Sequence, residues 1–122
     1  MVGHKLTPYE LGKAGEEAAL RYLKKKKYKI LARGFRLFRG EIDIIARDQN
    51  TLVFVEVKAR SRQDFGLPEE AITPAKQRQI RKIAEGFLMR NHSENVECRF
   101  DVLSLVKTEK STFKINHIKN AF

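Results

Sequence analysis

The sequence predicts an α/β fold in which a mixed central sheet is flanked by helices, in the order helix, three strands, helix, strand. Two segments combine a helix start signal with apolar residues at helical spacing, one beginning at Thr7 and one at Thr73. Between residues 39 and 60, two apolar-rich segments alternate with the period of two that strands require. A further strand-like segment, residues 96–106, follows the second helical segment.

The composition indicates a globular chain with a polyanionic partner. At 122 residues we expect one domain, residues 1–122, and 42% hydrophobic with 33% charged residues is typical of a folded protein. The formal net charge of +10 favours either nucleic acid or an anionic membrane surface, and nucleic acid suits a compact α/β chain better. The sequence has neither a membrane-spanning apolar run nor a signal-peptide core. We therefore expect a cytoplasmic protein without a membrane partner.

The cysteine and histidine residues do not suggest a metal site of their own. Cys98 is the single cysteine, so no internal disulfide can form. No Cys/His spacing resembles a zinc site, and we expect ordinary structural roles for the scattered histidines, His4, His92 and His117.

The sequence contains start signals for both predicted helices. Thr7 is placed as an N-cap, Pro8 as the first helical residue and Glu10 as the partner in a capping box. We expect this helix to end near residue 25. Thr73 and Pro74 repeat the signal, and the second helix should end near residue 90 with an apolar stripe facing inward.

Two adjacent acids on the first helix differ in their surroundings. Glu17 falls among basic residues on the charged side, which is typical of a solvated ion pair. Glu16 falls at the edge of the apolar arc, where a carboxylate needs a partner. Two interpretations stay open: the partner is a metal or basic group at the sheet, or Glu16 caps a backbone amide or pairs with a nearby arginine.

Nine basic residues and no acid lie between Glu17 and Glu41. Lysines near the end of the first helix are favoured by the helix macrodipole, whereas clustered positive charge is also rewarded by contact with phosphates. Lys76, in the first turn of the second helix, either helps to hold a phosphate or extends along the core edge to solvent. The predicted nucleic-acid contacts are Lys24, Lys26, Lys27, Arg33, Arg36, Arg39, Arg60 and Lys76.

A first strand is expected around residues 28–32, with turns at Gly34 and Gly40. A hairpin then joins residues 41–46 to residues 52–60. Glu41, Asp43 and Ile45 share one face of its first strand. The second strand has one wholly apolar face, and its other face becomes charged at Glu56, Lys58 and Arg60.

The hairpin register decides whether these charges form a site. With a two-residue loop at Gln49 and Asn50, opposed residues have numbers that sum to 99, so Asp43 lies opposite Glu56. Two carboxylates on one face cannot both stay ionised without a cation or a shared proton, and oxygen ligands suit Mg²⁺ or Mn²⁺. Lys58 projects from the same face. An odd loop without a bulge would instead separate the two acids.

After the hairpin we expect a loop over residues 61–66 and a short turn at residues 68–70. A last strand is expected at residues 113–118. Asp101 is an acid inside the strand at residues 96–106, and it either pairs with Arg99 on the same face or has a catalytic role.

The element order, with Asp43 followed by Glu56-Val57-Lys58, resembles the PD-(D/E)xK nuclease superfamily, in which an acid on one strand and an E-x-K on the next carry the chemistry. A closer resemblance is to the YraN-like family of small bacterial proteins, which are similar in fold to archaeal Holliday junction resolvases. The segments that carry it are GKAGEEAA, RGEIDIIARD, LVFVEVKAR, TPAKQRQIRKIAEGFL and RFDVLSL.

This resemblance implies a restriction-endonuclease-like αβββαβ core and a metal-dependent nuclease. It implies that Asp43, Glu56, Glu16 and the backbone carbonyl of Val57 bind Mg²⁺ or Mn²⁺, and that Lys58 is the catalytic lysine. Ile42 stands where the motif name has proline. The expected substrate is nucleic acid, DNA rather than RNA, with branched DNA a candidate, and a homodimer is a candidate assembly because resolvases form one.

Two other functions remain open. The chain could be a non-catalytic nucleic-acid-binding module on the same fold, in which Asp43, Glu56 and Lys58 form a salt-bridged strand face without metal. It could also be a basic assembly or ribosome-associated protein that binds RNA without preference for its structure. Intact acids argue against a pure binding module, because carboxylates repel phosphates.

Overall fold

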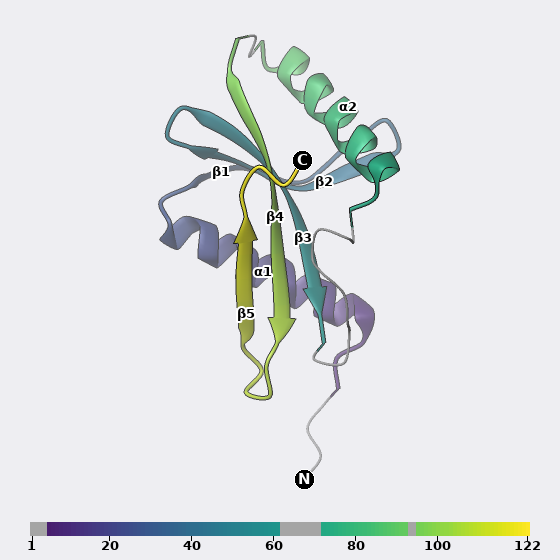
Figure 1. Ribbon diagram of the computed structural model, residues 1–122, viewed down its shortest axis with the longest axis vertical. Coiled ribbons are helices and arrows are strands. Elements are labelled where there is room, and N and C mark those ends of the chain that lie inside the picture. The colour runs from purple at the N-terminus through teal and green to yellow at the C-terminus, as the bar shows by residue number, and fades with distance from the viewer. Residues whose placement is uncertain (1–4, 62–71, 93–94) are drawn as a thin grey trace.

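The computed structural model describes residues 5–61, 72–92 and 95–122 (Figure 1). The predicted order of helices and strands is confirmed, including the last strand expected at residues 113–118. The described elements are α1 (Pro8–Lys25), β1 (Lys29–Leu37), β2 (Gly40–Asp48), β3 (Thr51–Arg60), α2 (Pro74–Arg90), β4 (Glu97–Lys107) and β5 (Phe113–Ile118). The loop and turn predicted for residues 61–70 lie outside the described residues, except for Ser61.

The five described strands form one mixed sheet in the order β1-β2-β3-β4-β5. The pair β3–β4 is parallel and the other three pairs are antiparallel. The parallel pair is the one joined through α2, since parallel neighbours need a crossover. This arrangement confirms the predicted α/β fold, a mixed sheet with helices and an αβββαβ core of the restriction-endonuclease-like kind.

The two helices cover different apolar clusters. Leu20 and Leu23 of α1 pack with Val53 and Val55 of β3 and with Leu103 of β4. Ile80, Ile83 and Phe87 of α2 instead pack with Ile42 of β2 and Phe54 of β3. In Figure 1, α1 crosses behind the strands and α2 lies at the upper right. The alternation along β3 therefore directs its wholly apolar face to α1 and its partly charged face to α2. None of the helices in the described part of the chain has the length and apolar character that a membrane crossing requires.

The predicted helix starts are confirmed. The Thr7 hydroxyl accepts a hydrogen bond from the Glu10 amide, and the Glu10 carboxylate accepts one from the Thr7 amide, which completes the capping box. The Thr73 hydroxyl accepts a hydrogen bond from the Lys76 amide at the start of α2. A cap of this kind contributes about 1 kcal/mol, so the local sequence alone determines where each helix begins.

The predicted turns at Gly34 and Gly40 are wrong. β1 continues to Leu37, and the turn consists of Phe38 and Arg39, which both have positive φ (52° and 59°). Gly34 lies inside β1 with φ +61°. Gly40 begins β2, where a Cβ atom would lie 2.8 Å from the Ile83 side chain of α2. The glycine at position 40 thus permits close packing on α2, a tertiary contact that the local sequence does not reveal.

This packing changes the faces of β2. Ile42 and Ile45 both join the cluster under α2, although strict alternation would place them on opposite faces. The β2–β3 ladder follows the predicted sum of 99 from Asp48–Thr51 to Ile44–Val55, and it ends there. The even register is therefore confirmed, but the predicted common face of Glu41, Asp43 and Ile45 is wrong, because the alternation of faces along β2 is interrupted between Ile42 and Ile44.

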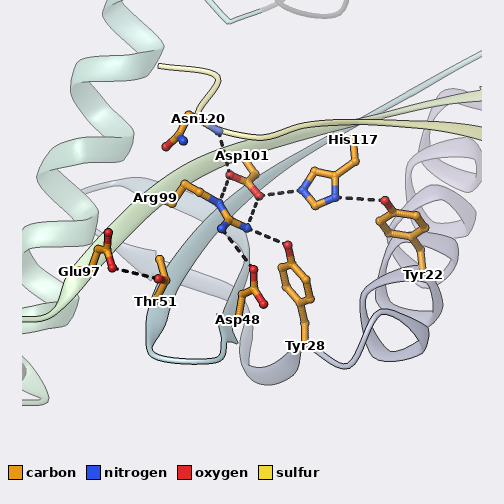
Figure 2. A network of polar contacts seen from close by, with 9 residues as sticks. All are labelled: Tyr22, Tyr28, Asp48, Thr51, Glu97, Arg99, Asp101, His117 and Asn120. Atoms are coloured by element: carbon orange, nitrogen blue, oxygen red, sulfur yellow. Dashed lines mark hydrogen bonds and ion pairs between the residues drawn. The ribbon is translucent and has the colours of Figure 1, made fainter.

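A buried polar network centres on Asp101 (Figure 2). Its side chain is fully buried and accepts four hydrogen bonds: two from Arg99 (2.9 and 3.1 Å), one from His117 Nε2 (2.7 Å) and one from the Asn120 amide (3.2 Å). Burial alone would raise the pKa of Asp101, but these hydrogen bonds hold it below its usual value. The predicted Arg99–Asp101 ion pair is confirmed.

The network also joins segments far apart in the chain. Arg99 donates to Asp48 at the end of β2 and to the Tyr28 hydroxyl after α1, while the His117 ring shares a hydrogen bond with Tyr22 of α1 (3.1 Å). Figure 2 shows these side chains converging from the helix, the hairpin and the last two strands. We conclude that the hydrogen bonds of the Asp101 network connect β5 and the residues after it to α1.

We predict that Asp101→Asn lowers the free energy of unfolding at pH 7 by about 3 kcal/mol, because it leaves the buried Arg99 charge without its carboxylate. A lowered folded pKa contributes stability above the unfolded pKa, near 4, and that contribution disappears as pH falls through the folded value. Urea unfolding between pH 2 and 7 should therefore show a shallower acid limb for the variant. Asp48→Asn, which removes a single partly exposed contact with Arg99, is the control and should cost about 1 kcal/mol. Equal acid limbs in wild type and Asp101→Asn would contradict this account.

We also predict opposite effects for alanine at two helical glycines of α1. A Cβ atom at Gly15 would lie 2.5 Å from the Ala59 Cβ of β3, whereas one at Gly12 would meet nothing within 4 Å. Gly12→Ala should raise the free energy of unfolding by up to about 1 kcal/mol through helix propensity. Gly15→Ala should lower it by about 1–2 kcal/mol, because overpacking outweighs that gain. Paired urea titrations would measure both, and equal stabilisation would show that α1 does not approach β3 this closely.

Candidate functional site

The candidate site lies where β2 separates from β3. Beyond Ile44–Val55 the two strands stop pairing, and the Val57 amide donates a 2.8 Å hydrogen bond to the Asp43 carboxylate. The N–H and C=O of one strand residue point to the same side, so the Val57 carbonyl also faces β2. The side chain of Asp43 thus occupies a position that a backbone carbonyl would fill in a continuous ladder.

Glu56 of β3 lies beside Asp43 and is buried, with 7% of its surface exposed. Burial raises the pKa of Glu56 to about 9, helped by a hydrogen bond to the Asp43 carboxyl and by its negative charge, while Lys76 and Lys58 oppose the shift. Near neutral pH the Glu56 carboxyl therefore keeps its proton. The prediction that these acids are neighbours is confirmed, although they lie just beyond the end of the β2–β3 ladder.

One oxygen of Glu56 is incompletely satisfied. Its Oε2 atom is buried and has no hydrogen-bond partner among the residues that the structure describes. The Lys76 amino group, from the first turn of α2, lies 3.9 Å away, which allows electrostatic attraction but is too long for a hydrogen bond. A buried polar oxygen without a partner costs about 1–3 kcal/mol, so this arrangement needs a functional or structural explanation.

Glu16 approaches the same acids from α1. It is half-buried, and its pKa is raised by burial and then by the negative charges of Asp43 and Glu41, while Lys13 and Arg33 oppose the shift. Glu16 therefore lies near both the acids of the sheet and Arg33, so both interpretations of its partner stay predictions. The adjacent Glu17 turns outward and pairs with Arg33 of β1 (2.5 Å).

Lys58 follows Glu56 by two residues and is half-buried on the same side of β3, paired in register with Ser104 of β4. Its charge lowers the pKa of Glu56, as does that of Lys76. Amino groups from β3 and α2 therefore act on one buried carboxyl.

A divalent cation fits part of this arrangement. No group of three or more His, Cys, Asp or Glu side chains within residues 5–61, 72–92 and 95–122 lies close enough to hold a metal ion. The available donors are two carboxylates, Asp43 and Glu56, with the Val57 carbonyl, and Glu16 adds negative charge nearby. One or two carboxylates are the usual protein ligands of Mg²⁺, which keeps water and phosphate in its other positions. Such an ion would provide the partner that the Glu56 Oε2 atom lacks.

Comparison with known sequences identifies the family. The profile of the "Uncharacterised protein family UPF0102" matches residues 15–105, which span the site from Glu16 to Lys76. A UPF0102 protein from Caldicellulosiruptor saccharolyticus is 51% identical over 114 residues, covering 93% of this chain and 97% of the relative. A UPF0102 protein from Prosthecochloris aestuarii is 45% identical over 122 residues, covering 96% of each. A third, from Clostridium beijerinckii, is 42% identical over 114 residues, covering 93% of each.

The chain belongs to the UPF0102 family. This is the YraN-like family indicated by its sequence segments, so the predicted membership is confirmed. The names of these relatives assign no reaction, and the roles predicted for Asp43, Glu56, Lys58, Glu16 and Val57 stay predictions.

The predicted phosphate contacts of this UPF0102 protein fall into two groups. Lys24, Lys26 and Lys27 lie exposed at the C-terminal end of α1, and Lys24 is about 12 Å along the helix axis from Glu16. The others lie on the β1–β2 hairpin, at the end of β3 and at the start of α2. They are Arg33, Arg36, Arg39, Arg60 and Lys76. Of the second group, Arg60 lies on β3 with Glu56 and Lys76 lies within the site itself.

Sequence patterns did not reveal all the residues around the site. The charge of Glu41 acts on Glu16, although alternation had suggested only that it shares a strand face with Asp43. The contact between Lys76 and Glu56 joins residues 20 positions apart and depends on the packing of α2, for which the sequence has no direct signal. The helix cap at Thr73 was the nearest available indication, because it places Lys76 in the first turn of α2.

We predict that Glu56→Gln stabilises the protein at alkaline pH in the presence of a chelator. A carboxyl whose folded pKa is about 9 loses stability as pH rises from its unfolded pKa, near 4.3, toward 9, since the native state then holds a proton that the unfolded state has released. Glutamine removes this loss, so its free energy of unfolding at pH 8 should exceed that of wild type by at least about 1 kcal/mol. Glu97→Gln, at an exposed acid of β4, is the control. Urea titrations from pH 5 to 9 give the free energy of unfolding at each pH. If it changes with pH in the same way for wild type and Glu56→Gln, Glu56 does not have a raised pKa and this account is refuted.

Proposed function

We propose that this UPF0102 protein is a metal-dependent nuclease of the PD-(D/E)xK type that hydrolyses phosphodiester bonds in DNA, with branched DNA as its substrate. One observation carries the proposal: the buried Glu56 carboxyl lies beside Asp43 with an unsatisfied oxygen, at the point where β2 leaves β3. Such an arrangement costs stability, and perturbed carboxyls of this kind are concentrated at functional sites.

The donor set supports hydrolysis assisted by Mg²⁺ or Mn²⁺. Asp43 and Glu56 would hold the ion with the Val57 carbonyl, and Glu16 would add charge from α1. When bound, the ion would polarise a phosphate oxygen and lower the pKa of the attacking water. The hydrogen bond from the Val57 amide fixes the orientation of the Asp43 carboxylate, so this ligand needs no rearrangement before the ion binds.

The two lysines have separate roles in this proposal. Lys58, on the same side of β3 as Glu56, would orient the attacking water or stabilise the negative charge that develops on the phosphate. Lys76 lies in the first turn of α2, where helix N-termini favour anions. It would exchange its long contact with Glu56 for a substrate phosphate once the cation has neutralised that carboxylate.

The basic residues of the β1–β2 hairpin, with Arg60, would contact the DNA backbone without reading its sequence. Their contacts to phosphate would make binding weaken as salt increases. A homodimer, as resolvases form, would present two such sites to the two symmetric strands of a four-way junction.

The second candidate function is a nucleic-acid-binding module without catalysis. The observation that favours it is the missing third acidic ligand: within the described ranges no three metal-binding side chains come together. In that case Lys76 and Lys58 would serve as the permanent counter-charges of Glu56.

We predict that Asp43→Asn and Lys58→Ala reduce metal-dependent cleavage at least about 100-fold, because the first weakens cation binding and the second removes a stabilising charge from the transition state. The assay incubates end-labelled linear duplex, single-stranded and four-way-branched DNA with Mg²⁺ or Mn²⁺, and compares each with a chelator control. Glu85→Gln, at an exposed acid of α2, is the matched control and should cleave like wild type. DNA binding without cleavage by wild type on every substrate would leave the binding module as the function.

A further inference from the structure

The tip of the β1–β2 hairpin has an unusual composition. Leu37 and Gly40 pair across a two-residue turn in which Phe38 and Arg39 both have positive φ. Such a turn is most favourable with asparagine followed by glycine, because other residues are strained there. Strain of about 1–3 kcal/mol per residue persists where the side chain contributes something else, so an aromatic residue at this position needs an explanation.

Burial in the core does not explain why an aromatic residue stands at position 38. It is 52% exposed, and the edge of its ring passes Gly86 of α2. Leu37 approaches Gly86 more closely, so the hairpin is anchored on α2 without depending on Phe38. Figure 1 shows this hairpin reaching away from the central strands to α2.

Basic residues lie at the hairpin tip with the exposed ring. The Lys82 amino group lies 5.0 Å from the centre of the Phe38 ring, and Arg36 and Arg39, which are exposed, are near neighbours of Phe38 in the sequence. A pocket of about 260 Å³ beside the tip is lined by Arg36, Leu37, Arg39, Gly40 and Glu41. Glu41 is the one acid in that lining, and it lies 3.9 Å from Arg36. An aromatic face among basic groups matches a nucleotide, which combines an aromatic base with a phosphate.

We propose that the hairpin tip is a binding site for an unpaired nucleotide, in which Phe38 stacks on the base while Arg36, Arg39 and Lys82 contact the adjacent phosphates. Base stacking on aromatic side chains, combined with a basic surface, is a general means of holding single strands. The inference rests on the proposed nucleic-acid substrate. It adds that the protein binds the part of this substrate in which the bases are unpaired. A fully paired duplex offers no free base face, so the site favours single strands and the unpaired or mobile bases of branch points.

The position of Phe38 relates this site to the proposed chemistry. Asp43 follows Phe38 by five residues along the same hairpin, which spans at most about 17 Å. That length equals about five stacked nucleotides at about 3.4 Å each. A base held at Phe38 would therefore place the phosphates a few nucleotides away near Asp43 and Glu56.

The experiment measures binding to fluorescently labelled single-stranded, four-way-branched and linear duplex DNA in a chelator, so that no cleavage occurs. Phe38→Ala should weaken binding to the first two about tenfold and to duplex less than about twofold, because stacking contributes about 1–3 kcal/mol per base. Tyr9→Ala is the matched control: Tyr9 is 72% exposed under Lys13, but lies on α1 and not at the hairpin, and its loss should leave all affinities unchanged.

Two further variants separate stacking from folding. Phe38→Asn with Arg39→Gly restores the favoured turn residues, so it should fold at least as stably as wild type and still lose the preference for unpaired bases. The chain contains no tryptophan, so Phe38→Trp supplies a single reporter whose fluorescence should be quenched by single-stranded DNA and not by duplex.

Equal losses on duplex and single strands for Phe38→Ala, or an unquenched Phe38→Trp, would overturn the stacking site while leaving the nuclease proposal intact if wild type cleaves DNA. Selective loss in Phe38→Ala without any metal-dependent cleavage by wild type would support the stacking site and refute the nuclease. Absence of DNA binding by wild type would overturn both.

Discussion

The departure of β2 from β3 at Asp43 is the constraint on which the candidate site depends. β3 is held in the sheet by its ten-residue parallel register with β4, whereas the β1–β2 hairpin follows α2 through the close contacts at Gly40 and Gly86. The β2–β3 pairing ends at Ile44–Val55, and beyond it the Val57 amide bonds to the Asp43 carboxylate. The acids therefore lie between a strand held by β4 and a hairpin packed on α2.

Two buried acids on neighbouring strands, Asp101 and Glu56, differ in how completely they are hydrogen-bonded and in the direction of their pKa shifts. Asp101 of β4 accepts four hydrogen bonds, and its pKa lies below the usual value despite complete burial. Glu56 of β3 keeps an unsatisfied oxygen, and its pKa rises to about 9. Asp101 is paired in register with Val55, so the two acids lie one position apart on opposite faces of the sheet. Violations of the rule that buried polar groups are satisfied are expected where function requires them.

Much of this fold could be predicted because the decisive signals are local. Capping at Thr7 and Thr73 determines the helix starts, and the two-residue turn at Gln49 and Asn50 determines the register that brings Asp43 toward Glu56. The misplaced turns at Gly34 and Gly40 have the opposite cause. There Gly40 permits a contact with α2, which is a tertiary feature, and Gly34 adopts a positive φ inside β1, while the real turn uses two residues that turn preferences disfavour.

The distances within the site were predictable only for the β2–β3 hairpin, although the faces of Glu16 and Lys76 followed from helical periodicity and capping. Asp43, Glu56 and Lys58 belong to one local unit, so their proximity follows from the register. The approach of Lys76 and the charge of Glu16 on Asp43 require the packing of both helices, and the roles of His117 and Asn120 in the Asp101 network require the return of the chain after β5. No period or motif in the sequence encodes those distances.

The central claim is that Asp43 and Glu56 form an incomplete carboxyl pair that a divalent cation completes. Calorimetric titration of Mn²⁺ at pH 7 in two buffers of different ionisation enthalpy tests it most directly, since it reports both binding and proton release. A Glu56 pKa of about 9 predicts that wild type binds Mn²⁺ with release of about one proton, and that Glu56→Gln binds far more weakly and releases none. Failure of wild type to bind, or equal binding by Glu56→Gln, would contradict the account.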